Sequence, residues 1–269
     1  MQDLLNTILL GIVEGLTEFL PVSSTAHLLI AERLLGLEGA RWEAFTIIIQ
    51  LGAILAVVAV YWRKFVDVLV GLPRDAEAGY FALSVLIAFL PAAVIGVVAI
   101  KFINAVLLKP TLVMPVIGAT LMGGGIIILI FERLAPTPRY RDGDRLPLSK
   151  ALQIGFCQVL AIVPGVSRSG ATILGGELLG VDRKAAALFT FYLAVPTMFG
   201  ASVFELYKKW HELSAADAPS IALGFAVSFV VAYFVVRQFI DFIGRYGLKP
   251  FGWYRIAAGA AIFAALALH

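Results

Sequence analysis

The chain has 269 residues, of which 61% are hydrophobic and only 14% are charged, and its formal net charge at pH 7 is +3. A soluble domain is nearer about 25% charged, so this composition excludes a soluble globular protein and predicts a polytopic membrane protein. The small positive charge is typical of orientation signals and of contacts with anionic lipid, and it argues against a nucleic-acid-binding surface.

The predicted elements form two similar series along the chain. It begins with an apolar stretch, 4–35, that is too long for one span and that Leu20-Pro21 interrupts. Three spans of about 20 residues follow at about 44–62, 79–100 and 111–131. The stretch 149–180 repeats the outline of the first, with a break at Pro164-Gly165, and three more spans follow at about 185–207, 218–236 and 251–268.

The two interrupted stretches predict helical hairpins. Each break leaves two short halves, at about 4–19, 24–35, 150–163 and 168–179. Paired short segments that are broken at matching places in two halves of a chain indicate re-entrant hairpins around a binding site. Irregular backbone at that depth is tolerated only inside protein or beside water.

The fold class that we predict is an all-α polytopic membrane protein with six transmembrane helices and two re-entrant helical hairpins in an inverted-topology repeat. The chain forms a single membrane domain, 1–269, in which repeats 1–131 and 149–269 are joined by a cytoplasmic linker, 132–148. Because a hairpin returns to its own side and three spans then cross over, the second repeat begins on the opposite side.

The distribution of basic residues predicts how the chain is oriented in the membrane. Of the 21 lysines and arginines, this topology puts 13 on one side and 6 on the other, and it leaves Arg168 and Arg255 within segments. The richer side is cytoplasmic by the positive-inside rule, so both termini and the mouth of the first hairpin face outward. If both hairpins were instead full spans, the chain would cross eight times and its halves would share one orientation.

Two further features bear on the compartment. The only cysteine, Cys157, excludes an intrachain disulfide and any CxxC metal or redox motif. We interpret it as a small apolar residue in a helix. The first residues lack the basic segment of a secretory signal, so we expect no cleaved signal peptide.

The first hairpin carries two glutamates in a stretch that otherwise reads as lipid-buried, where an ionisable group costs roughly 2.5–3.5 kcal/mol. Glu14 and Glu18 are four residues apart and therefore share a helix face. Two such carboxylates imply a bound cation, a shared proton or a nearby arginine. The alternative is a helix end whose glutamates reach interfacial water.

Hydroxyl residues follow where the second half-helix of this hairpin begins. One of Ser23, Ser24 and Thr25 is expected to be the N-cap, and the same helix N-terminus offers backbone N–H groups to an anion. Ser24 and His27 are three apart and share a face, and a hydroxyl beside an imidazole is the minimal activated nucleophile. The alternative for His27 is a satisfied core residue.

The second hairpin supplies a basic group at the matching position. Its half-helix begins with Ser167, Arg168 and Ser169, and Gly170 and Thr172 follow. A guanidinium at that depth suits bidentate capture of phosphate, and a salt bridge to the glutamates of the first hairpin is an alternative compatible with this role. The two hairpins together predict a phosphate-handling site, where a carboxylate pair suits a hard divalent cation.

Both motifs resemble those of a known family. EGLTEFLPVSSTAHL at 14–28 and PGVSRSGATI at 164–173 are similar to the motifs of the undecaprenyl pyrophosphate phosphatases, also called bacitracin-resistance phosphatases. QLGAILAV at 50–57 and FTFYLAVP at 189–196 also resemble family segments. The resemblance spans nearly the whole chain. It implies a phosphatase of the bacterial inner membrane that converts undecaprenyl pyrophosphate to the monophosphate carrier for peptidoglycan synthesis, with Mg²⁺ or Ca²⁺ as cofactor.

The resemblance also implies roles for individual residues. Glu14 and Glu18 would handle a metal ion or a proton, Ser24 would be the nucleophile, and His27 would be its base or a rival nucleophile. Arg168 would clamp the pyrophosphate. The expected substrate-binding residues around it are Ser23, Thr25, Ser167, Ser169, Gly170 and Thr172. The second motif lacks the histidine and aspartate of the other integral-membrane lipid phosphatases, which argues against their histidine–aspartate mechanism.

A transporter or flippase for a lipid phosphate or an anion is the alternative, because secondary transporters are also built from inverted repeats with broken helices. A Ser–His pair beside two carboxylates is more than transport needs, so the residues favour the enzyme. The expected partners are the polyprenyl pyrophosphate and membrane lipid but no nucleic acid, and a homodimer is left open. The active site is expected to open to the periplasmic side.

The predicted orientation can be tested with single surface cysteines in a variant that lacks Cys157. We expect Glu38→Cys to react with a membrane-impermeant maleimide in intact cells, because position 38 is predicted to lie outside. Asp142→Cys should react only after the membrane is permeabilised. The opposite labelling pattern would reverse the orientation.

Overall fold

Six helices of the computed structural model are long and apolar enough to cross a membrane, as the sequence predicts. They are α3 (Ala40–Val60), α5 (Ala76–Phe102), α6 (Val113–Leu134), α9 (Arg183–Lys209), α10 (Ala218–Tyr246) and α11 (Lys249–Ala267). The structure describes residues 2–37, 39–107, 109 and 111–268, without the side chains of 100–102 and 104, so position 38 lies outside it. In these residues the β pairing is limited to an isolated bridge between Tyr140 and Val181, and the all-α class is confirmed.

Two helical segments, the end of α10 and the whole of α4, were not predicted from hydropathy. α10 continues past the predicted end at 236 because Phe239 and Ile243 remain buried on one face while charged residues occupy the other. α4 (Trp62–Gly71) follows α3 directly. It was not predicted, because this short segment contains three charged residues and does not resemble a span. In both segments an amphipathic helix forms where hydropathy alone suggests a loop. Short helical turns occupy Ile103–Leu107, Gly143–Arg145, Leu160–Ile162, Trp210–Glu212 and Ala215–Asp217.

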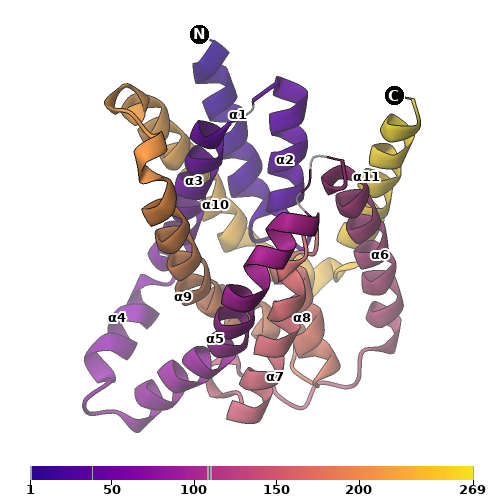
Figure 1. Cartoon of the computed structure of the whole chain (residues 1–269). Helices are drawn as coiled ribbons and strands as arrows, with labels where there is room; N and C mark the ends of the chain where they lie inside the picture. The colour runs from indigo at the N-terminus through magenta and orange to yellow at the C-terminus, as the bar shows by residue number, and fades with distance from the viewer. Residues whose placement is uncertain (1, 38, 108, 110, 269) are drawn as a thin grey trace.

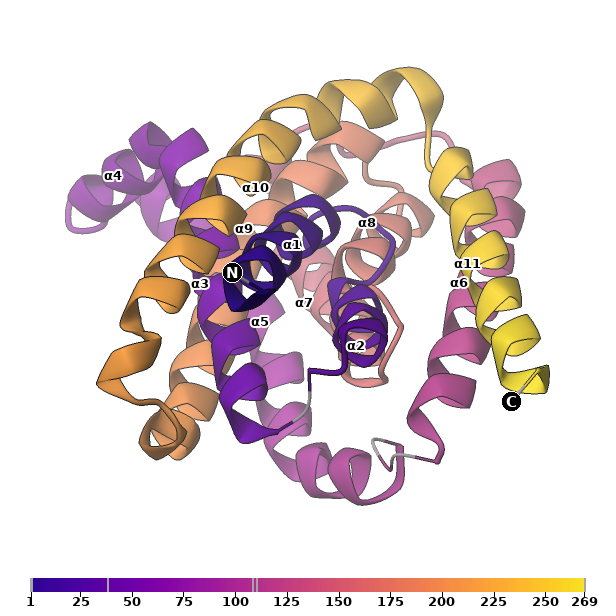
Figure 2. The ribbon, with the colours of Figure 1, turned by 90° about the horizontal axis from the view of Figure 1, so that it is seen from above.

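The two interrupted stretches form helix pairs that break at the predicted prolines. The first pair is α1 (Gln2–Thr17) and α2 (Ser24–Leu35), and the second is α7 (Leu148–Val159) and α8 (Arg168–Leu178). The pairs enter the bundle from opposite ends (Figure 1), and the long helices encircle α1 and α2 (Figure 2). That the pairs re-enter a bilayer, and that the chain is an inverted repeat with the boundaries given above, stay predictions.

Glycines let the long helices approach the hairpins and one another closely. A Cβ at Gly15 of α1 would lie 2.8 Å from the Ser228 carbonyl oxygen of α10, and a Cβ at Gly125 of α6 would lie 2.5 Å from the Gly252 oxygen of α11. Small residues are the usual solution where helices pack in a membrane. At the tip of the first hairpin, Phe19 packs edge-on against Phe191 of α9. The contacts of Gly15 and Phe19 hold the first hairpin inside the bundle.

Candidate active site

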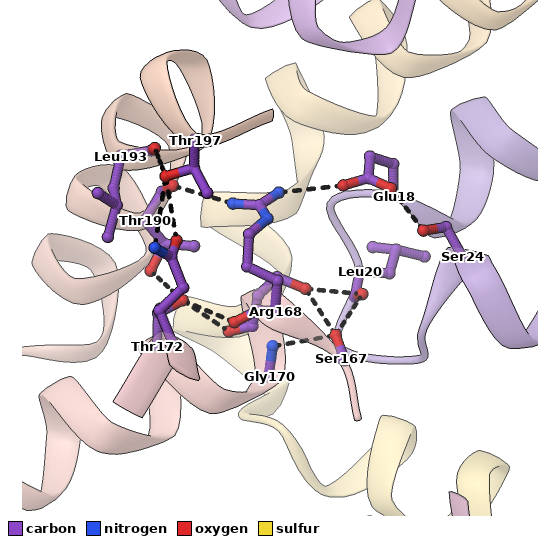
Figure 3. Close-up of polar contacts among 12 residues, drawn as sticks. Glu18, Leu20, Ser24, Ser167, Arg168, Gly170, Thr172, Thr190, Leu193 and Thr197 are labelled. Atoms are coloured by element: carbon purple, nitrogen blue, oxygen red, sulfur yellow. Dashed lines mark hydrogen bonds and ion pairs between the residues drawn. The ribbon is translucent and has the colours of Figure 1, made fainter. Parts of the chain in front are cut away.

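The tips of the two hairpins contact each other directly (Figure 3). The Leu20 carbonyl of the first tip accepts hydrogen bonds from Ser169 Oγ at 2.8 Å and Ser167 Oγ at 3.4 Å. Ser167 is also the N-cap of α8, because its Oγ accepts the Gly170 N–H at 3.1 Å. Both serines therefore hold the junction together, and their expected contact with a phosphate stays a prediction.

Arg168 extends from the start of α8 to the first hairpin. Its Nη2 lies 3.2 Å from Glu18 Oε1, and its Nη1 donates to the Thr190 carbonyl of α9 at 3.3 Å. The salt bridge that the sequence suggests is thus present, and Glu18 is its partner. Arg168 Nε is buried and has no hydrogen-bond partner among the described residues, which leaves a donor for a further acceptor.

Glu14 is fully buried one turn before Glu18. Neither of its carboxylate oxygens has a hydrogen-bond partner among the described residues, and the charged groups that act on it are Glu18 and Arg168. A buried carboxylate without a partner is costly, so this pair suits a proton or a hard cation. The described part of the chain holds no group of three His, Cys, Asp or Glu that is placed to bind a metal ion. A cation here would therefore take its remaining ligands from other oxygen atoms, such as those of hydroxyls, carbonyls, water or a bound phosphate.

Ser24 is bonded to a carboxylate and not to the histidine that the spacing suggests. Its Oγ donates to Glu18 Oε2 at 2.5 Å. Both nitrogens of His27 are engaged elsewhere, Nδ1 with the Ser23 carbonyl at 2.7 Å and Nε2 with Tyr254 OH at 2.6 Å. Ser24 and His27 are therefore not bonded to each other in the structure, because Glu18 at the first tip accepts the hydroxyl. The catalytic roles expected of the two residues stay predictions. Ser23 is the N-cap of α2, as one of the three hydroxyl residues was expected to be.

Three other predicted substrate-binding residues lie at the edge of this cluster. Thr25 is exposed on the first turn of α2. Thr172 accepts a hydrogen bond from Thr190 Oγ1 at 2.8 Å, so it joins α8 to α9. A Cβ at Gly170 would lie 3.4 Å from Pro21 Cβ, so this glycine permits the close approach of the tips. The structure does not bring these three residues to the Glu18 carboxylate.

Residues 7–261 match the family model described as bacitracin resistance protein BacA. The chain belongs to this family. A protein from Cereibacter sphaeroides named undecaprenyl-diphosphatase is 52% identical over 97% of this chain and 96% of its own length. A protein of the same name from Bradyrhizobium diazoefficiens is 47% identical over 100% of this chain and 99% of its own length. The family resemblance of the two motifs is thereby confirmed.

Sequence reasoning missed Arg255 of α11, which it left inside a span. Its side chain is 2% exposed and bonds carbonyl oxygens at both breaks, that of Pro21 at 3.2 Å and that of Gly165 at 3.0 Å. It also donates to the carbonyls of Thr120 at 2.9 Å and Leu121 at 3.4 Å on α6. A basic residue inside an apolar span is the signal that points to it. In this family member, Arg255 positions both hairpin tips against α6.

Removing the Arg255 guanidinium should loosen both tips together. In Arg255→Met, four carbonyls lose a buried charged donor, and we expect a loss of about 3 kcal/mol or more in stability. Hydrogen–deuterium exchange should rise in peptides that cover 18–24 and 163–168. Lys249→Met, at an exposed position on the same helix, is the matched control. Faster exchange in only one of the two peptides would contradict a shared anchor.

Proposed function

We propose that the chain is an undecaprenyl-diphosphatase of the bacterial inner membrane. It would hydrolyse undecaprenyl diphosphate to the monophosphate and inorganic phosphate, and so recycle the lipid carrier for peptidoglycan synthesis. The names of its relatives support this activity. The structural observation that carries the proposal is the chain of contacts from Ser24 through Glu18 to Arg168. Transport requires no hydroxyl bonded to a carboxylate, so this contact favours a hydrolase over a lipid-phosphate transporter.

Ser24 is the proposed nucleophile and Glu18 its base. Oγ attacks the terminal phosphorus and passes its proton to Glu18, whose Oε2 lies 2.5 Å away. A bond forms between Oγ and the phosphorus, and the bond from that phosphorus to the bridging oxygen breaks. Glu18 gives its proton to the leaving lipid monophosphate. As a carboxylate again, it takes a proton from the water that attacks the phosphoserine. The bond from the phosphorus to Oγ then breaks, Glu18 returns the proton to Oγ, and inorganic phosphate leaves. Because both nitrogens of His27 are bonded elsewhere, Ser24 is favoured over His27.

Arg168 is proposed to bind the diphosphate oxygens. Its unpartnered Nε and the Nη2 that reaches Glu18 are donors in one plane, which suits bidentate binding of a phosphoryl group. When phosphate oxygens take over from Glu18, the carboxylate is released to accept the proton of Ser24. The N-termini of α2 and α8 meet at the same junction, and their backbone N–H groups and dipoles favour an anion.

A divalent cation is proposed at Glu14 and Glu18. The two unpartnered oxygens of Glu14 fit a hard cation, and phosphate oxygens of the substrate would supply its other ligands. Bound there, Mg²⁺ or Ca²⁺ would neutralise charge on the diphosphate. The site is proposed to open to the periplasmic side, where the first hairpin has its mouth.

The proposed reaction predicts phosphate release from undecaprenyl diphosphate by the purified protein. Ser24→Ala and Arg168→Ala should each reduce the rate by about a hundredfold or more, because each removes a group that acts in the transition state. Ser149→Ala, an exposed serine at the start of α7, should leave the rate unchanged. After an acid quench, mass spectrometry should detect phosphate on Ser24. A phosphoryl group on His27, or normal turnover by both alanine variants, would refute this assignment.

The proposed cation site predicts a loss of activity with a chelator and its recovery with Mg²⁺ or Ca²⁺. We also expect the cation to raise the melting temperature of the wild-type protein in the presence of a non-hydrolysable methylene diphosphonate. Glu14→Gln should abolish that rise, because a neutral amide is a poor ligand for a hard cation. Glu212→Gln, at an exposed position, is the control. An unchanged rise in Glu14→Gln would remove Glu14 from the site.

A further inference from the structure

A groove of about 510 Å³ adjoins Arg168 and lies between α5, the end of α7 and α9. We propose that this groove, called the tail groove below, binds the first isoprene units of a prenyl diphosphate and thereby selects long-chain substrates. The proposal rests on the proposed function, because it takes the diphosphate to be held at Arg168. A volume of this size is typical of a small-molecule site (about 300–1,000 Å³). It therefore holds the head-proximal part of a long prenyl chain and leaves the rest to the bilayer.

The walls of the tail groove are suited to hydrocarbon. α5 and α9 contribute mainly small and apolar side chains, namely Phe89, Ala92, Ala93, Gly96, Val97, Gly200, Ala201 and Phe204. Two of the polar residues in the wall, Gln158 and Thr197, are hydrogen-bonded to each other across 3.3 Å. Thr197 Oγ1 also donates to the Leu193 carbonyl at 2.7 Å. With these groups satisfied, the middle of the groove offers a ligand apolar contacts.

The two ends of the tail groove match the two ends of a prenyl diphosphate. At the inner end, Arg168 is paired with Glu18, which holds the proposed nucleophile. At the other end Val97 and Phe204 are 69% and 50% exposed, on spans whose outer surface is expected to face lipid. Glu205 also lines the groove, and its carboxylate is paired with Lys208. A diphosphate at Arg168 would therefore have its first carbons in the groove. This continuity identifies the substrate tail as the occupant.

Two glycines in the walls leave room that packing does not explain. A Cβ at Gly96 or at Gly200 would meet no atom within 4 Å, although a glycine in a helix costs about 1 kcal/mol relative to alanine. Elsewhere in the bundle, glycines such as Gly155 allow backbones to touch, although Gly79 and Gly123 also have open space. α5 and α9 also carry Pro91 and Pro196 inside the helix, and an interior proline removes a hydrogen bond and kinks a helix. In each helix most groove residues follow that proline.

The proposal is tested by placing a large side chain in the tail groove, either on α5 or on α9. Gly96→Trp and Gly200→Trp are compared with Gly123→Trp, whose glycine lies in α6, also has open space at its Cβ and is outside the groove. For each protein, kcat/KM is measured with undecaprenyl diphosphate and with methyl diphosphate, a short substrate that has no isoprene unit. We expect a fall of about tenfold or more with the long substrate for both groove variants. The short substrate and the control should change less than about twofold.

Unchanged kcat/KM with the long substrate would assign the tail groove to a bilayer lipid and overturn the proposal. An equal fall with both substrates would overturn it as well, because the effect would then lie at the phosphate site. If tryptophan lowers the melting temperature, Gly96→Leu and Gly200→Leu repeat the comparison with a smaller side chain.

A binding measurement separates this proposal from the proposed function. A prenyl monophosphate with a benzophenone in its second isoprene unit should label peptides within 89–97 and 197–205 of the wild-type protein. Undecaprenyl monophosphate should compete for that labelling. Labelling there without any phosphate release would refute the phosphatase and keep the groove. Labelling confined to other helices would refute the groove whether or not phosphate is released.

Discussion

The carboxylate of Glu18 is the group through which the two hairpins depend on each other. It belongs to the first hairpin, yet it is bonded to Arg168 of the second at 3.2 Å and to Ser24 across the break at 2.5 Å. The side chains of this ion pair are 11% and 6% exposed, and removing one partner of such a buried pair costs about 3–5 kcal/mol. This ion pair joins the hairpins together with the bonds to Leu20 and those of Arg255. It differs from them because it also holds the proposed nucleophile beside its base.

A broken helix in the middle of a membrane protein requires partners for the backbone groups that the break exposes. Side chains supply them here for carbonyls at both breaks. At the first break, the Leu20 carbonyl accepts a hydrogen bond from Ser169 and the Pro21 carbonyl accepts one from Arg255. At the second break, the Pro164 carbonyl accepts a hydrogen bond from Thr120 and the Gly165 carbonyl accepts one from Arg255. Each tip is thus satisfied by the other tip or by helices α6 and α11. The half-helices α2 and α8 begin directly after these tips, capped by Ser23 and Ser167.

The sequence predicted those parts of the fold and the site that depend on local pattern. Hydropathy located the six long helices, and proline placed both breaks. The second half-helix was expected to begin at Ser167, Arg168 and Ser169, and α8 does begin at Arg168. Hydrogen-bond partners were harder to predict from the sequence. Ser24 and His27 share a helix face by their spacing, but Ser24 is bonded to Glu18 and His27 to Tyr254. No local pattern relates Arg255 to the breaks that it joins, and only the packing of α11 on α6 brings it there.

The charges at the junction explain why a phosphate site here needs more than its arginines. Glu14 and Glu18 offset Arg168 and Arg255, so the four side chains have no formal net charge when all are ionised. An arriving diphosphate adds several negative charges in a region of low dielectric, where each uncompensated charge is costly. The N-termini of α2 and α8 contribute about half a positive charge each, which is too little. The proposed divalent cation, or protons, would supply the balance, and the unpartnered oxygens of Glu14 are the site proposed for it.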